Sequence, residues 1–167
     1  MADPLADRLK KLAAQKEQGV RAEKNAIEFQ QRVNNFISDN ARPEYDRLLA
    51  LLQKRIDAVN PALGDLPKFV YQPNQQVVEQ GNAAAYLYFD KPILNAPDNR
   101  LLLSFGPHRA AIYVGFVEQP AAIRYSLHAA ASDALDRIVW VGDLGEITSE
   151  KLVELILEQL TTYYFGL

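Results

Sequence analysis

Residues that bind metals or act as nucleophiles are sparse in this chain. It has two histidines, His108 and His128, and no cysteine. The absence of thiols excludes disulfides, cysteine nucleophiles and cysteine-ligated zinc or iron–sulfur centres. The two histidines do not form H-x-x-H or H-E-x-x-H spacing, which would indicate a metal on a helix. We therefore predict no metal or other cofactor, and we interpret His128 as a surface residue on the polar face of a strand.

Nucleophilic catalysis also lacks a recognisable pattern. No serine lies in a G-x-S-x-G context, and none has an evident base beside it in the sequence. Asp143 and Glu146 lie shortly before a predicted helix, but they lack the spacing of a calcium loop, so we interpret 142–146 as a strand-to-helix connection. The sequence therefore favours a protein without catalytic activity, and whether the chain is an enzyme stays open.

Tyrosines are the strongest candidates for a binding surface. Tyr86, Tyr88 and Tyr113 fall in apolar segments whose alternation places them on one sheet face, beside Gly115. Tyrosine combines apolar area with a hydroxyl, and a glycine in a strand allows a ligand or another backbone to approach. Two interpretations remain open: a ligand or partner surface, or a core face with hydroxyls at its rim.

His108 and Arg109 lie in the loop of a predicted hairpin. Loops held by rigid strands often carry function, and this pair of residue types suits contact with an anion. The alternative is a solvated turn.

Composition and charge narrow the class. A hydrophobic fraction of 49% over 167 residues is that of a folded chain, and the net charge is −3. Residues 1–60 hold 11 Lys and Arg against 9 Asp and Glu, whereas 61–167 hold 7 against 12. The second half argues against nucleic acid as a partner, and the interleaved acids of the first half favour a solvated helix face. The longest apolar runs are too short to span a membrane, so we predict a cytoplasmic protein.

The first 60 residues predict two helices. Asp3 and Pro4 are typical of a helix start, and Gly19 is the single strong interruption before Asp39. Pro43 is typical of the start of a second helix after a turn at 40–42, which predicts a helical hairpin. We expect Phe29, Val33 and Phe36, at the heptad spacing of a coiled coil, to pack on Leu48, Leu52 or Ile56 of the second helix.

The rest of the chain alternates like an antiparallel sheet. Arg100 to Val117 is its predicted centre, a hairpin with apolar residues at nearly every position, which predicts cover on both faces. Ile112, Val114 and Phe116 should share one face of a central strand. The predicted strands are 85–89, 101–105, 110–117, 123–130 and 138–141, with 69–71 and 76–80 as further candidates.

The predicted fold class is α+β: a long N-terminal helix plus a second helix, a meander of about five to six antiparallel strands, and an amphipathic C-terminal helix. We divide the chain into a helical hairpin at 1–60 and a sheet with its helix at 61–167, which together form one compact unit.

An apolar stripe on the first helix bears on function. Leu5, Leu9 and Leu12 have no partner within the predicted hairpin, so we expect a protein partner, first of all a homodimer. The alternative is a bend at Gly19 that folds the stripe onto the sheet. The function that we predict is a non-catalytic protein-interaction module, such as an adaptor, chaperone or assembly subunit. A small-molecule-binding module that uses the tyrosine face is the alternative, and an enzyme ranks last.

Overall fold

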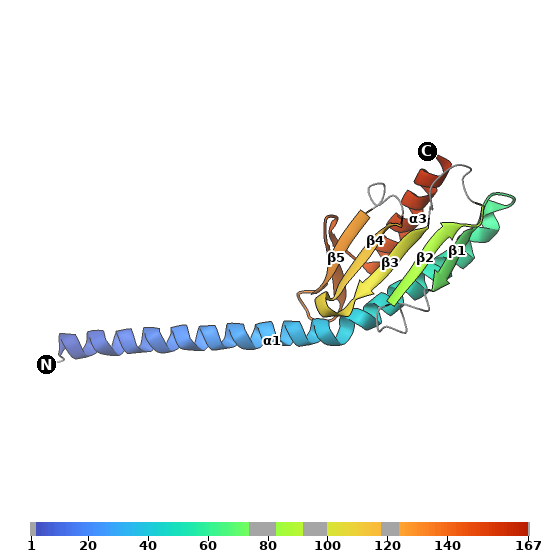
Figure 1. The fold of residues 1–167 in the computed structure, drawn as a ribbon. Coiled ribbons are helices and arrows are strands. Elements are labelled where there is room, and N and C mark those ends of the chain that lie inside the picture. The colour runs from blue at the N-terminus through green and yellow to red at the C-terminus, as the bar shows by residue number, and fades with distance from the viewer. Residues whose placement is uncertain (1–2, 74–82, 92–99, 118–123, 167) are drawn as a thin grey trace. The chain divides into compact units, whose positions relative to one another are not determined.

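The structure, a computed structural model, describes residues 3–73, 83–91, 100–117 and 124–166. The chain divides into two compact units, Met1–Phe36 and Ile37–Leu167. Among the described residues, the first unit consists of the N-terminal part of one long helix, and the second holds the rest of that helix, the sheet and a C-terminal helix. The class is α+β, as the sequence predicts, with a long N-terminal helix, an antiparallel sheet and a C-terminal helix (Figure 1).

Helix α1 runs without interruption from Pro4 to Val59. Asp3 caps its start, since the Asp3 carboxylate accepts a hydrogen bond from the Leu5 amide at 2.9 Å. The predicted turn at 40–42 does not form, and Pro43 lies inside the helix. The expected helical hairpin was therefore wrong, and Gly19 likewise lies within an unbroken helix.

Burial on both sides of Pro43 explains why the helix continues. Proline inside a helix removes one hydrogen bond and costs about 3 kcal/mol. Ala41, Tyr45 and Leu48 lie on either side of it and are all buried. Each large apolar side chain contributes about 1.5–3 kcal/mol on burial, so packing of this face outweighs the proline penalty.

A continuous helix also separates the residues that the hairpin would have joined. Phe29 is 48% exposed, while Val33 and Phe36 are half-buried. Their predicted burial against Leu48, Leu52 or Ile56 was wrong, and those three residues instead contribute to the core of the second unit.

The described strands form one seven-stranded antiparallel sheet in which each strand pairs with the next along the chain. The central hairpin is confirmed, because β3 and β4 pair from Leu101–Phe116 to Gly106–Ala111. The sheet gains a short strand at 145–147, where we expected a connection, and the strand predicted at 76–80 lies outside the described residues. The strands are β1 (Phe69–Pro73), β2 (Ala83–Phe89), β3 (Leu101–Gly106), β4 (Ala111–Phe116), β5 (Arg124–Ala131), β6 (Ile138–Gly142) and β7 (Gly145–Ile147).

One face of the sheet packs on helices. Ile112, Val114 and Phe116 of β4 are buried on this face, as predicted. Tyr45 of α1 stacks on Phe105 with ring centroids 5.2 Å apart, and its hydroxyl donates to the Leu103 carbonyl at 3.1 Å. Figure 1 shows the C-terminal part of α1 and helix α3 on the same side of the sheet.

The other face carries no helix of the described residues, and the expected cover on both faces of the hairpin stays a prediction. Burial alternates along β3, where Leu101, Leu103 and Phe105 are buried and Leu102 and Ser104 are half-buried. We call this second side the open face. Its residues on the central strands are Tyr86, Tyr88, Leu102, Ser104, Tyr113, Gly115, Arg124, Ser126 and His128.

Helix α3 (Ser149–Phe165) closes the core of the second unit. Thr148 caps its start by accepting from the Lys151 amide, and Gly166 ends it in the left-handed region with φ of 67°. Two ion pairs join it to α1: Arg47 with Glu150 at 2.7 Å, and Arg55 with Glu154 at 2.6 Å.

Candidate functional site

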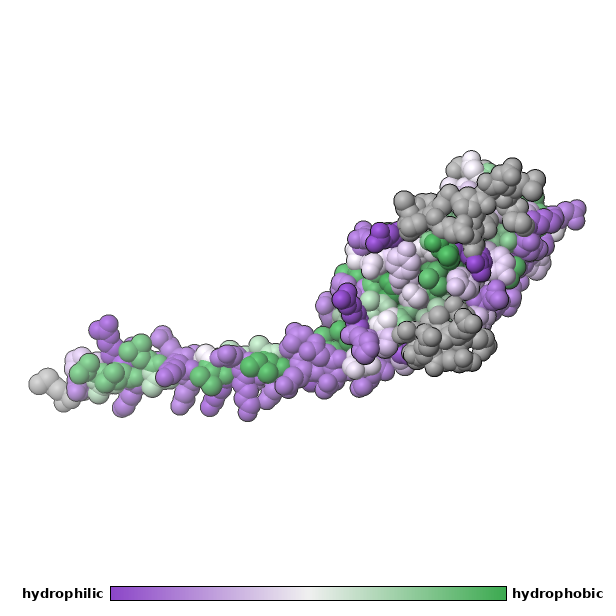
Figure 2. Space-filling view, in the orientation of Figure 1, coloured by the Kyte–Doolittle hydropathy of each residue, from purple (hydrophilic) through white to green (hydrophobic). Residues whose placement is uncertain are grey.

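Pairing register brings the predicted tyrosines onto the open face. Tyr86 of β2 lies opposite Leu102 of β3, and Leu102 lies opposite Gly115 of β4. Tyr88 and Tyr113 share their side by the alternation of their strands. The helices lie behind the sheet in Figure 1, so Figure 2, in the same orientation, shows the open face. Between the parts drawn in grey, hydrophobic, weakly polar and strongly hydrophilic residues are mixed there.

Gly115 has a local role that the sequence did not indicate. A Cβ at this position would overlap the Tyr113 hydroxyl oxygen and would lie 2.7 Å from Tyr113 Cζ. The Tyr113 ring therefore lies across Gly115 on the same strand. The space that we expected a ligand or another backbone to use is taken by Tyr113.

The other two tyrosines have side-chain neighbours of their own. The Arg100 guanidinium lies 4.9 Å from the centroid of the Tyr86 ring, which is a cation–π geometry. The Tyr88 hydroxyl lies 3.2 Å from Gln72 Oε1 and donates to it. The sequence analysis did not predict a role for Arg100. Arg100 lies one residue before β3, and β3 pairs with the strand that carries Tyr86, so the pairing of the two strands is the signal that could have found it.

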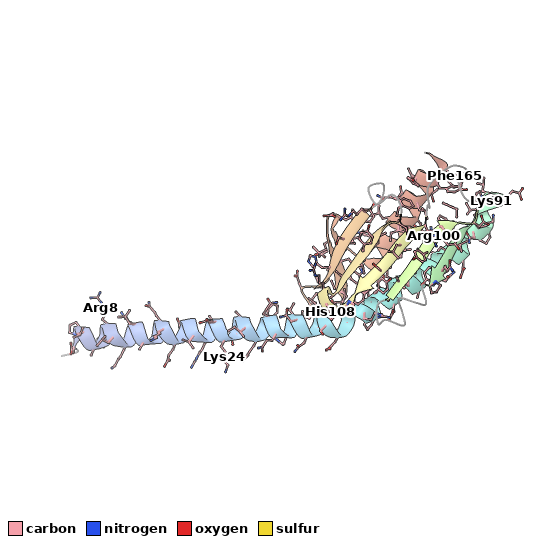
Figure 3. The ribbon with its side chains drawn as sticks, in the orientation of Figure 1. Arg8, Lys24, Lys91, Arg100, His108 and Phe165 are labelled. Atoms are coloured by element: carbon pink, nitrogen blue, oxygen red, sulfur yellow. The ribbon has the colours of Figure 1, made fainter. Side chains whose placement is uncertain are left out.

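His108 and Arg109 lie at the tip of the central hairpin, in a 3-10 turn (Pro107–Arg109) that joins β3 to β4. Ala110 closes the turn in the left-handed region with φ of 45°, and its amide donates to the Pro107 carbonyl at 3.3 Å. Both side chains are exposed. Figure 3 shows His108 at this end of the sheet and Arg100 toward the other end of β3.

A shallow depression of about 340 Å³ connects the hairpin tip to the open face. It brings Tyr113 together with His108 and Arg109, whereas Tyr86 and Tyr88 do not line it. Ser104 and Ser126 flank Tyr113 on the neighbouring strands and were missed as lining residues. The lining residues are Ser104, Gly106, Pro107, His108, Arg109, Ala111, Ile112, Tyr113 and Ser126.

The depression offers three hydroxyls, an imidazole and a guanidinium, which suits binding of a small polar or anionic group. His128 lies on the same face opposite Ala111 but does not line it. Within the described ranges, no three acids or histidines gather as metal ligands would.

The N-terminal segment presents a second candidate surface, one of apolar residues. Val20 follows Leu9 by about three helical turns, and Ile27 follows Leu5 by about six, at 3.6 residues per turn. These residues therefore lie on one side of the helix. We call them the N-terminal stripe: Leu5, Leu9, Leu12, Val20 and Ile27 are 63%, 56%, 54%, 59% and 54% exposed. Figure 2 shows hydrophobic residues recurring along this helix.

Phe29 lies outside this stripe and has partial cover. The Arg32 guanidinium lies 5.7 Å from the centroid of its ring, one turn further along the helix. The N-terminal stripe is therefore the more continuous apolar surface of the first unit.

No helix within the described ranges has the length and apolarity needed to cross a membrane. No protein-family model, curated protein or solved structure matches the chain.

Proposed function

We propose that this chain is a non-catalytic protein-interaction module, an adaptor, chaperone or assembly subunit, that binds another protein chain through the N-terminal stripe. The observation that carries the proposal is the exposure of five large apolar residues along one side of a helix. Burial of each such side chain contributes about 1.5–3 kcal/mol, which provides a driving force for association. A second copy of the chain is the partner that we expect first, because a two-fold dimer lets one surface cover its own copy.

The lack of intrachain packing along the N-terminal segment supports the proposal. Within the part of the first unit that the structure describes, there is no second helix or strand against which the segment could pack. Most of the stability of a helix in a protein comes from packing of its apolar face rather than from its intrinsic propensity. Pairing of the N-terminal segment with a second copy would provide packing for its apolar face.

The test is the mass of the full chain in solution by light scattering. We expect a dimer that the double variant Leu9→Glu, Leu12→Glu converts to a monomer. Leu66→Glu is the matched control, since Leu66 is an exposed leucine of the second unit with an exposed fraction of 53%, close to the 54% of Leu12. A wild-type monomer at micromolar concentration, or a double variant that keeps the dimer mass, would reject association through the stripe.

The depression at the hairpin tip favours a second candidate, a small-molecule-binding module on the open face. His108 and Arg109 at its edge suit an anionic group. Inorganic phosphate, titrated against the labelled protein by NMR, should shift the resonances around His108 and Arg109 at millimolar concentration or below, and Arg109→Ala should abolish the shift. An unchanged spectrum would remove this candidate. An enzyme ranks third, and the cytoplasmic location stays a prediction.

A further inference from the structure

We infer that the N-terminal helices of two copies pair antiparallel, with the two-fold axis near Val20. The inference rests on the proposed self-association and adds its orientation and register. It comes from the charged residues that interrupt and flank the N-terminal stripe.

Two charges of opposite sign lie in the stripe itself. Lys16 lies one turn from both Leu12 and Val20, and Glu23 lies one turn from both Val20 and Ile27. Both are exposed. Any partner that covers the whole stripe must therefore accommodate Lys16 on one side of Val20 and Glu23 on the other.

A parallel pair of helices in register would bring like charges together. Such a pair places Lys16 against Lys16 of the second copy, and Glu23 against Glu23 of the second copy. Like charges held together at a helix interface are destabilising.

An antiparallel pair centred near Val20 turns the same two residues into attractive contacts. Lys16 then faces Glu23 of the second copy, and the symmetry axis repeats the pair. Leu12 faces Ile27 of the second copy, so apolar layers lie next to the charged ones. Opposite charges in such a seam fix orientation and register more than they add affinity.

The charges beside the stripe agree with this arrangement. Glu17 and Lys24 are separated by about two turns and lie along the same edge of the stripe. Antiparallel helices bring like edges together, so Glu17 faces Lys24 of the second copy, again twice. Among the described residues of one chain, Lys24 makes a long contact to Glu28, at 3.9 Å between exposed side chains.

Gly19 fits a close approach at the axis. Glycine in a helix interior costs about 1 kcal/mol relative to alanine. Nothing in this chain requires it, because a Cβ at Gly19 would have no atom within 4 Å. Beside Val20, the missing side chain leaves room for Val20 of the second copy.

Charge reversal tests the register without removing apolar area. Lys16→Glu should weaken the dimer about tenfold, and the double variant Lys16→Glu, Glu23→Lys should restore it, as measured by sedimentation equilibrium. Lys10→Glu makes the same reversal on the same helix away from the stripe, and should change the dissociation constant by less than about twofold. A parallel dimer would respond to neither stripe variant, which would overturn the inference.

Cysteine cross-linking tests the orientation directly, because the natural chain contains no cysteine. Full-length Leu12→Cys and Ile27→Cys proteins are mixed and oxidised, and the disulfides are identified by mass spectrometry. The antiparallel pair predicts a link between position 12 and position 27 and none between two copies of position 12.

The two proposals fail in different ways. A dimer in which position 12 links to position 12 would overturn the antiparallel arrangement while leaving self-association intact. A wild-type chain that stays monomeric by light scattering would overturn both.

Discussion

A buried serine links three elements of the second unit at the scale of single residues. Ser149, at the start of α3, accepts a hydrogen bond from the Trp140 indole at 2.9 Å and donates to the Glu44 carboxylate of α1 at 2.7 Å. Glu44 also pairs with Arg47, which reaches Glu150 of α3. The hydrogen bond from Arg47 lowers the pKa of Glu150, so this carboxylate is ionised more readily than a free one.

Removing the Ser149 hydroxyl should therefore destabilise the fold. Ser149→Ala leaves the buried Trp140 N–H without its acceptor, which costs about 1–3 kcal/mol, while alanine suits the helix start sterically. Urea denaturation measures the change. Ser126→Ala, at an exposed serine of β5, is the control and should stay within about 0.5 kcal/mol of the wild type. Equal effects of the two substitutions would show that the link contributes nothing.

Tyr45 makes the fold sensitive to high pH. Burial, followed by the charge of a neighbouring Tyr71, raises the pKa of Tyr45 well above its ordinary value of 10.0. The unfolded chain ionises this tyrosine near pH 10, whereas the folded chain keeps it neutral, so rising pH favours unfolding. The stability that neutral Tyr45 contributes is complete below about pH 10 and is lost above it.

Tyr45→Phe separates this effect from general alkaline unfolding. Phenylalanine does not ionise, so the stability difference between wild type and variant should narrow as pH rises above 10, by up to about 1.4 kcal/mol per pH unit. Urea denaturation of both proteins between pH 8 and about 11 measures the difference. A constant difference across this range would show that Tyr45 ionises equally in both states.

Elements differ in how well the sequence predicts them. Strands β3 and β4 follow from alternation between turn residues, and the burial of Ile112, Val114 and Phe116 follows from the same pattern. The continuation of α1 through Pro43 does not follow from the sequence pattern. Local preference favours a break at this proline, and the burial of Ala41 and Tyr45 overrides that preference. Sequence pattern records the preference of the chain and not the packing that competes with it.

Pro43→Ala tests the unbroken helix. If residue 43 lies in a helix interior, alanine restores a hydrogen bond and removes a clash, so the free energy of unfolding should rise by about 1–2 kcal/mol after the entropy that proline removes from the unfolded state is deducted. Urea denaturation measures the change. A loss of stability would favour the turn at 40–42, where proline fits the first position of a second helix.

At the scale of the whole molecule, the chain combines a packed unit with a helical segment whose apolar side chains are exposed. The candidate sites were predictable in part. Periodicity predicted Leu5, Leu9 and Leu12 of the N-terminal stripe and the shared face of the tyrosines, but it did not predict Val20 and Ile27 as part of the stripe. The contact of Tyr113 with Gly115 and the depression at the hairpin tip depend on side-chain positions. Register between strands, which sequence spacing alone does not fix, brings Ser104 and Ser126 beside Tyr113.

Amide hydrogen exchange of the full chain at low and high protein concentration tests association through the stripe most directly. Pairing should slow exchange of residues 5–27 as concentration rises, because protection then requires a second copy, while exchange of β4 in the core stays slow at every concentration. Fast exchange of residues 5–27 at all concentrations, or protection that does not depend on concentration, would contradict the account.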